Sequence, residues 1–487
     1  MTETELFQTV EQLIFSHFPH QPTPGQREAC SGIVRFLYNP DPHAAFILKG
    51  YAGTGKTTLI SALIQTAPQL QIHTRLLAPT GRAAKILSTY SGHNAFTIHK
   101  IIYTTTTDPY GNTRITKAPN KDRYTLFIVD EASMIGADAQ PNTPRQLLDD
   151  LIDYVLSGDH CRLLLLGDSA QLPPVGSEES PALDEEYLSM ISPLQPSTFQ
   201  LTQVVRQHDI SDILLNATIL RNHIAGLETW QQPDLPFFRI TPKADFLRLS
   251  SLDLEELLTA QYSKHTEQCC IITQSNKRAN QYNQYIRNRI FFREEAISTG
   301  DHIMIVKNNY YWLDKESDIG FIANGDIAEI QSIRNHQELY GFHFVDATIR
   351  FVDYPDAPPQ DCKLLLETLY SNSPSLTNEE QQQLFQNIME DYADLPNKSA
   401  RLQALKKNPY YNALQIKFAY ALTCHKTQGG QWPVVIIDQG YITDEMINRN
   451  YLRWLYTAIT RATEKVYLLN FQDFFFEDSE TSGNDLL

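Results

Sequence analysis

One eight-residue loop constrains the fold of this chain more than any other segment: Gly-Tyr-Ala-Gly-Thr-Gly-Lys-Thr at residues 50–57. It completes the pattern G-x-x-x-x-G-K-[ST] between an apolar run at residues 44–48, which predicts a buried strand, and residues 58–64, which predict a helix. Glycines let the backbone turn successive N–H groups toward anionic oxygens, and the helix N-terminus adds partial positive charge. The loop therefore predicts that the chain binds the phosphates of a nucleoside triphosphate.

Several residues of this loop have distinct chemical roles. The ammonium group of Lys56 can reach the β- and γ-phosphates, and the hydroxyl of Thr57 can ligate Mg²⁺. We expect ATP and Mg²⁺ as the ligands. The remaining predicted nucleotide contacts in the loop and the first turn of its helix are Gly53, Thr54, Gly55 and Thr58.

A second apolar run, residues 126–130, ends in two neighbouring carboxylates. In an enzyme with a phosphate loop, Asp130 would hold Mg²⁺ and Glu131 would polarise the attacking water as a general base. A strand that ends in an ordinary acidic turn is the alternative interpretation. The position downstream of the phosphate loop favours the catalytic one.

The composition of the chain excludes some classes of protein but does not by itself identify the function. The chain of 487 residues has a net charge of −17, which by itself argues against nucleic-acid binding, although a local groove can be basic in an acidic protein. No apolar run approaches the ~20 residues of a membrane span, and the acidic N-terminus does not resemble a signal peptide. The six cysteines are scattered without a C-x-x-C pair, which argues against a zinc site or a disulfide framework, and the four beside apolar segments are predicted to be buried thiols: Cys30, Cys161, Cys269 and Cys270. We therefore expect a cytoplasmic protein that does not bind membranes.

Short apolar runs alternate with helical segments along the chain, which is typical of parallel α/β layers. The runs extend over too long a span for one sheet, so two α/β domains are predicted. The expected strands are residues 46–49, 75–78, 126–130, 162–167, 270–273, 434–438 and 465–469. Two stretches depart from this alternation of strands and helices. Residues 101–121 surround a strong turn and predict a β-hairpin, and residues 300–352 alternate apolar and polar residues, which predicts a small β-barrel.

The order of the remaining motifs resembles that of superfamily 1 helicases. The most specific are Gly-Asp-Ser-Ala-Gln-Leu-Pro-Pro-Val at residues 167–175, the segment around His425 and Lys426, and Thr-Ala-Ile-Thr-Arg-Ala at residues 457–462. Pro-Gly-Gln at residues 24–26 resembles the adenine-reading Q motif of this family. Further segments that match in order are residues 78–84, 97–100 and 201–207.

Within the superfamily the chain is similar to the RecD/Dda-like branch, because Val205 stands where UvrD/Rep-like proteins have a tyrosine that stacks on adenine. The resemblance implies an α/β fold with two RecA-like P-loop domains, a β-hairpin insert in the first and an SH3-like β-barrel insert in the second. The implied divisions are residues 1–205 for the first domain with a pin hairpin at 101–121, 206–299 and 415–475 for the second, 300–414 for the barrel with a helical extension, and 476–487 for an acidic tail.

The same resemblance implies roles for particular residues. Gln171 would report the γ-phosphate, and Arg206 and Arg461 would act as arginine fingers from the second domain. Further implied nucleotide contacts are Gln26, Gln428 and Gly429. The implied contacts to single-stranded DNA are Pro79, Thr80, Thr97, His99, Thr423, His425 and Lys426, with Tyr110 at the tip of the hairpin placed to split the duplex.

The leading hypothesis is an ATP-dependent DNA helicase or translocase that moves 5′ to 3′ on single strands and unwinds tailed duplexes. One alternative is an RNA helicase, or a translocase that displaces proteins without unwinding. A second alternative is a nucleotide-gated nucleic-acid binding module with little turnover. We expect a monomer whose further partners, if any, are replication or recombination proteins.

Overall fold

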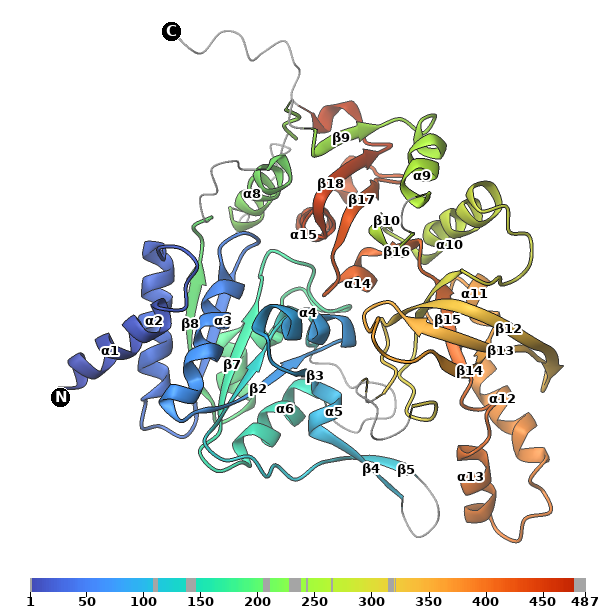
Figure 1. The fold of residues 1–487 in the computed structure, drawn as a ribbon, viewed down its shortest axis with the longest axis horizontal. Coiled ribbons are helices and arrows are strands. Elements are labelled where there is room, and N and C mark those ends of the chain that lie inside the picture. Colours follow the sequence, from blue (N-terminus) through green and yellow to red (C-terminus); the bar gives the residue numbers. More distant parts are fainter. Residues whose placement is uncertain are drawn as a thin grey trace.

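The computed structural model describes residues 2–107, 113–136, 146–204, 211–226, 238–241, 244–263, 266–313, 319 and 321–476. The described parts form two parallel-sheet domains, a β-barrel and a two-stranded hairpin (Figure 1). The predicted hairpin-tip residue Tyr110, the predicted arginine finger Arg206 and tail residues 477–487 lie outside the described residues.

The first domain is built on a six-stranded parallel sheet in the order β3-β2-β6-β7-β1-β8. The side chains of Phe46 and Leu48 on β1 join one hydrophobic cluster, and those of Ala45 and Ile47 join another, because successive residues of a strand face opposite sides. Both faces of the sheet are therefore buried. The strands are β1 Ala44–Gly50, β2 His73–Ala78, β3 Ala95–Thr97, β6 Thr125–Val129, β7 Arg162–Gly167 and β8 Gln195–Leu201.

Helices cover the two faces of this sheet. The cluster that includes Phe46 also holds residues of α1 Glu3–Phe15, α2 Pro24–Leu37, α3 Lys56–Thr66 and α4 Gly81–Ser91. The cluster on the other face holds residues of α5 Ile98–Ile102, α6 Leu147–Leu156 and α7 Glu185–Ile191. The strand–loop–helix order predicted around residues 50–57 is confirmed, since β1 leads directly into the loop and α3 begins at Lys56.

The second domain has a five-stranded parallel sheet in the order β16-β10-β17-β18-β9. Its strands are β9 Phe246–Leu249, β10 Cys269–Thr273, β16 Ala421–Thr423, β17 Trp432–Asp438 and β18 Ala462–Leu469. Its helices are α8 Asp212–Ala225, α9 Leu254–Tyr262, α10 Asn276–Tyr285, α14 Cys424–Thr427 and α15 Arg449–Ile459. Every residue of α15 from 451 to 459 is buried, so this helix lies inside the protein rather than on its surface.

A closed five-stranded barrel, the expected SH3-like insert, interrupts the second domain between α10 and β16. Its strands are β11 His302–Ile305, β12 Ile327–Leu339, β13 Phe342–Phe351, β14 Gln360–Leu365 and β15 Leu414–Phe418. Before β15 the chain forms α11 Glu367–Tyr370, α12 Asn378–Glu390 and α13 Lys398–Lys406. Leu384, Ile388 and Leu405 pack against Phe342 and Phe344 of β13, so the polar helical extension belongs to the barrel (Figure 1).

The predicted hairpin is confirmed as the antiparallel pair β4 Tyr103–Thr107 and β5 Thr113–Lys117, at the bottom of Figure 1. Its base is fixed to α6, because the Tyr103 hydroxyl donates to Asp150 Oδ2 at 2.9 Å and Lys117 Nζ to Asp153 Oδ2 at 2.8 Å. The base of the hairpin is therefore attached to the first domain through α6.

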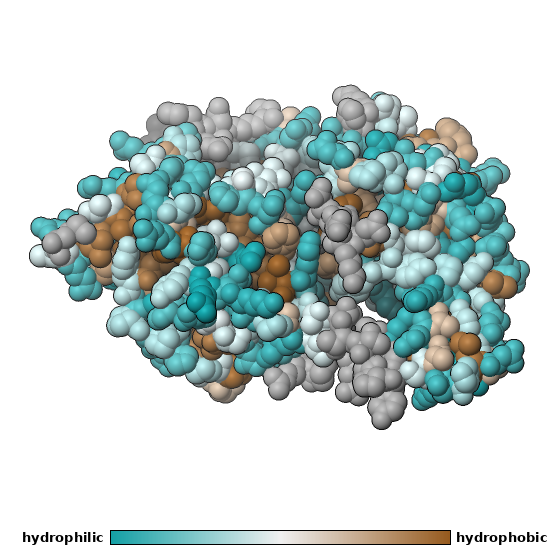
Figure 2. Space-filling view, turned by 60° about the horizontal axis from the view of Figure 1, so that its bottom comes forward, coloured by the Kyte–Doolittle hydropathy of each residue, from teal (hydrophilic) through white to brown (hydrophobic). Residues whose placement is uncertain are grey.

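The cysteines and the surface agree with the composition. All six cysteines are buried free thiols, which confirms the burial predicted for four of them and adds Cys362 and Cys424. In the described part of the chain, no helix has the length and apolar content needed to cross a bilayer. Hydrophilic residues predominate on the face shown in Figure 2, and its apolar residues form separate patches.

Candidate nucleotide site and nucleic-acid groove

The phosphate loop has glycine at two positions where the backbone conformation favours it. Gly53 has φ +73° and Gly55 has φ +77°, in the left-handed region that favours glycine. A Cβ atom at Gly53 would also lie 2.8 Å from Leu214 Cδ1 of α8, so the second domain closely covers the loop. Lys56 Nζ donates to the carbonyl oxygen of Gly50 at 2.6 Å. The lysine is thus held over the loop by a neutral acceptor, which a phosphate oxygen could replace.

The two carboxylates after β6 lie in contrasting surroundings. Asp130 accepts hydrogen bonds at both oxygens, from the Tyr90 hydroxyl at 2.7 Å and from the Glu131 N–H at 2.9 Å. Glu131 has φ +51°, an uncommon conformation for a residue with a side chain, and such strain concentrates at functional sites. Burial raises the pKa of Glu131, and the positive charges of Arg461 and Lys56 oppose that rise. The structure therefore brings three of the predicted catalytic residues into one charged cluster.

Arg461 reaches this cluster from the second domain. Its side chain is only 4% exposed. Its guanidinium donates to the carbonyl oxygens of Thr457 and Gly430 at 3.1 and 3.4 Å, and within the described residues it forms no ion pair with a carboxylate. A buried cation bonded mainly to neutral oxygens gains from an incoming anion. This environment suits an arginine that contacts a phosphate.

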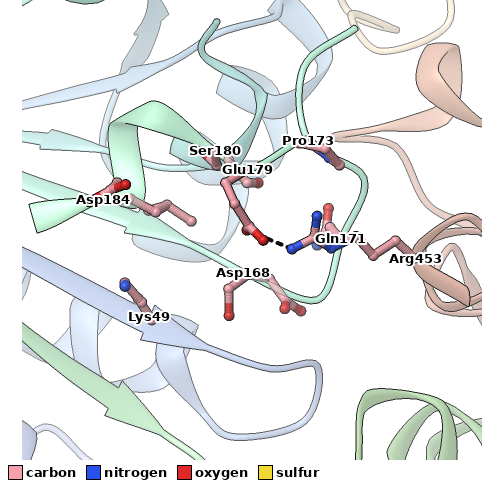
Figure 3. A pocket seen from close by; sticks show the side chains of 11 residues that line it. Lys49, Asp168, Gln171, Pro173, Glu179, Ser180, Asp184 and Arg453 are labelled. Atoms are coloured by element: carbon pink, nitrogen blue, oxygen red, sulfur yellow. Dashed lines mark hydrogen bonds and ion pairs between the residues drawn. The ribbon is translucent and has the colours of Figure 1, made fainter. Parts of the chain in front are cut away.

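Gln171 lines a cavity of about 210 Å³ at the boundary between the domains (Figure 3). The side chain is 8% exposed and its Oε1 has no hydrogen-bond partner. An orphaned buried oxygen costs free energy unless a ligand or water donates to it. Lys49 and Asp168 line the same cavity, and Glu179 pairs with Arg453 of α15 beside it. Gln171 is therefore placed to bond a water or a ligand group.

Three other predicted nucleotide contacts lie near the loop or at the domain boundary. Gln26 donates to the carbonyl oxygens of Thr54 and Gly55 at 3.3 and 3.5 Å and accepts from the Thr23 N–H, which caps α2. Gln428 instead donates to the carbonyl oxygen of Leu172 at 2.8 Å.

Gly429 has φ +71° and lies against the start of α4, where an added Cβ atom would be 3.2 Å from Thr80 Oγ1. Direct contact of Gln26, Gln428 or Gly429 with a nucleotide remains a prediction.

A groove of about 450 Å³ separates the first domain from the barrel. Thr97, one of the predicted DNA contacts, lines it together with Lys85 and Lys100. Aromatic rings alternate with these lysines: Lys85 Nζ lies 5.1 Å from the ring centre of Tyr354, and Lys100 Nζ lies 4.8 Å from that of Phe96. Cations interleaved with aromatic rings are typical of surfaces that hold single strands.

The remaining predicted DNA contacts lie at strand ends in the two domains. Pro79 and Thr80 follow β2, and the Thr80 hydroxyl accepts from the Ala83 N–H to cap α4. His99 is half-buried on α5. Thr423 ends β16, and His425 is exposed on α14.

Burial lowers the pKa of Lys426, also on α14, to about 8, so the ammonium group is still mostly protonated at pH 7. An added Cβ atom at Gly429, three residues after Lys426, would lie 3.2 Å from Thr80 Oγ1, so the segments that carry predicted DNA contacts in the two domains are neighbours at the boundary.

Sequence reasoning missed several side chains that join the two domains. Leu172 donates its N–H to Thr457 Oγ1 at 2.8 Å, and Arg453 Nη2 bonds Glu179 Oε2 at 2.6 Å. Tyr456 contacts both the phosphate loop and Asp168. Their position inside or beside recognised motifs was the only sign in the sequence that these residues are functional. Their partners are hundreds of residues away in the chain, so the contacts themselves could not be predicted.

Comparisons with known proteins show which proteins this chain is similar to. A family model described as an AAA domain matches residues 21–233, and one described as a UvrD-like helicase C-terminal domain matches residues 418–469. The chain is 37% identical over 167 residues to the ATP-dependent RecD2 DNA helicase of Deinococcus radiodurans, a match covering 34% of this chain and 20% of that protein. It is 31% identical over 206 residues to the ATP-dependent DNA helicase dda of Enterobacteria phage T4, covering 41% and 42%.

The chain thus matches only a fifth of the RecD2 protein and less than half of the phage protein. Among solved structures, a Pif1 helicase from Bacteroides in complex with ADP-AlF3 and single-stranded DNA covers 95% of both chains with a TM-score of 0.48 at 15% identity.

Proposed function

We propose that this chain, which belongs to the superfamily 1 helicases related to RecD and Dda, hydrolyses ATP to move 5′ to 3′ along single-stranded DNA and to unwind tailed duplexes. One observation carries the proposal. Burial raises the pKa of Glu131 in the first domain, and Arg461 of the second domain and Lys56 of the first lie close enough to oppose part of that rise. The rate of hydrolysis at such a site depends on the position of the two domains relative to each other.

In the proposed reaction, Lys56 exchanges its bond to Gly50 for phosphate oxygens, and Arg461 stabilises charge on the transferring phosphoryl group. Glu131 accepts a proton from the attacking water, which Gln171 Oε1 helps to orient by accepting a second hydrogen bond. All four side chains act on the γ-phosphate or its water. Opening and closing of the two domains would then follow the chemical state of the nucleotide.

The chain also offers oxygen ligands that fit Mg²⁺. Thr57 is exposed in the first turn of α3 and Asp130 follows β6, and both carry hard oxygen donors. No group of three or more acidic, histidine or cysteine side chains in the described residues forms a separate metal cage. Nucleotide-bound Mg²⁺ takes only one or two protein ligands and completes its shell with phosphate and water. The ion would neutralise phosphate charge during transfer.

The strand would lie across the domain boundary near Thr80 and Gly429 and along the groove lined by Lys85 and Lys100. These side chains can bond phosphates or stack with bases without reading a sequence, as a motor requires. Movement follows if closure changes the distance between the contacts of the two domains. The hairpin β4–β5, fixed to the first domain at its base, would meet the duplex.

Lys56→Ala should abolish ATP turnover, because it removes the side chain that holds the β- and γ-phosphates. ATP hydrolysis would be followed by phosphate release, with and without a single-stranded oligothymidylate. Lys398→Ala, which removes an exposed lysine from α13 of the helical extension, is the control and should retain most of the activity. Turnover by Lys56→Ala at the wild-type rate would contradict the proposed site.

The alternatives differ in what stimulates hydrolysis. An RNA helicase would respond to single-stranded RNA more strongly than to DNA of the same length. A binding module would show no stimulation by either polymer. The proposed function requires stimulation by single-stranded DNA.

A further inference from the structure

Helix α15 of the second domain presents several side chains to the first domain. Arg453 pairs with Glu179, and Thr457 Oγ1 accepts from the Leu172 N–H. Tyr456 lies between these two on the same helix and is 1% exposed. The helix thus packs on the first domain through side chains on either side of the buried tyrosine.

The hydroxyl of Tyr456 uses both its acceptor and its donor on the first domain. It accepts a hydrogen bond from the Ala52 N–H at 2.9 Å and donates one to Asp168 Oδ2 at 2.6 Å. Ala52 belongs to the phosphate loop, and Asp168 follows β7. A single oxygen atom from the second domain therefore connects two separate segments of the first.

Asp168 is well placed to carry this connection to the site of chemistry. It is 2% exposed, and its other oxygen, Oδ1, accepts from the Ala170 N–H at 2.9 Å. Gln171 is the next residue along the chain. Burial raises the pKa of Asp168, and the nearby charges of Lys56 and Arg461 and the hydrogen bond from Tyr456 oppose part of that rise.

We propose that Tyr456 is a positioning residue that locks the phosphate loop to Asp168 when α15 is seated, and so makes phosphate geometry depend on domain closure. Unlike Arg461, it acts through hydrogen bonds to the loop and to the segment that carries Gln171. The inference rests on the proposed function, because it concerns the rate of ATP hydrolysis.

A purely structural tyrosine is the contrasting interpretation, and α15 supplies a matched control. Tyr451 lies on the same helix at 6% exposure, and its hydroxyl accepts from Gln439 Nε2 at 3.2 Å within the second domain. Tyr456→Phe and Tyr451→Phe each remove one buried hydroxyl and keep the ring. Only the first removes a bridge to the phosphate loop.

The test measures kcat and KM for ATP with saturating single-stranded oligothymidylate. Tyr456→Phe should lower kcat about tenfold and change KM less than about twofold, because a bond to a charged group is lost without loss of a phosphate contact. Tyr451→Phe should keep both values within about twofold of wild type. An unchanged kcat in Tyr456→Phe, or an equal loss in both variants, would overturn the proposal.

A double-mutant cycle then tests whether Tyr456 acts through Asp168. Adding Tyr456→Phe to Asp168→Asn should lower kcat by less than about twofold, because the bond is already impaired. If the two substitutions instead lower kcat independently, so that their separate effects multiply, the proposed action of Tyr456 through Asp168 would be overturned. A wild-type chain without ATPase activity would contradict the proposed function, which is a distinct result.

Discussion

Glu131→Gln should lower the rate of ATP hydrolysis by about a thousandfold while leaving ATP binding nearly unchanged, in line with the loss of a general base. The glutamine has the same shape but cannot take a proton from the attacking water. Because Glu131 already occupies a left-handed backbone conformation, a substitution that keeps the side-chain length avoids new strain. Single-turnover hydrolysis and equilibrium binding of a fluorescent ATP analogue separate the two effects.

Glu186→Gln provides the control, since this carboxylate is exposed on α7 of the same domain. It should hydrolyse ATP at the wild-type rate. Burial raises the pKa of Glu131, so wild-type turnover should fall as the pH drops through a value above that of an ordinary carboxyl group. Hydrolysis by Glu131→Gln within about threefold of wild type would rule out the assigned base.

Arg461→Ala should slow hydrolysis by about a thousandfold, at the lower end of what an arginine finger contributes, with ATP affinity reduced far less. The expected cause is loss of charge stabilisation on the phosphoryl group during transfer. Arg461→Lys keeps the charge but loses the planar fork, so it should recover only part of the rate. An equal loss of binding and hydrolysis in Arg461→Ala would identify a structural residue.

Much of the central architecture is predictable because buried parallel strands are nearly continuous apolar runs. β7, with four consecutive leucines, and β17 were expected within one or two residues of their bounds. β8 and β9 were not expected. Each lies at the edge of its sheet, and β8 contains proline, serine and glutamine on a half-exposed surface. An edge strand buries too little of each residue to leave a clear apolar pattern.

The candidate site also contains residues that the sequence predicts and residues that it does not. Lys56 and Glu131 were predictable because the loop and the strand end that hold them are local in sequence. The Tyr456 bridge was not, since Ala52 and Tyr456 are 404 residues apart and a hydroxyl in an apolar helix resembles any buried tyrosine. The helical extension shows the same limit. Its polar sequence did not reveal that Leu384 and Ile388 cover the end of the barrel.

The central claim is tested most directly by comparing unwinding of two duplexes that are identical except for a 5′ or a 3′ single-stranded tail. Strand separation would be followed by a fluorophore and quencher across the duplex, with ATP and Mg²⁺ present and with Lys56→Ala as the inactive control. The account predicts ATP-dependent unwinding of the 5′-tailed duplex and little of the 3′-tailed one. Unwinding of the 3′-tailed duplex alone, or of neither, would contradict it.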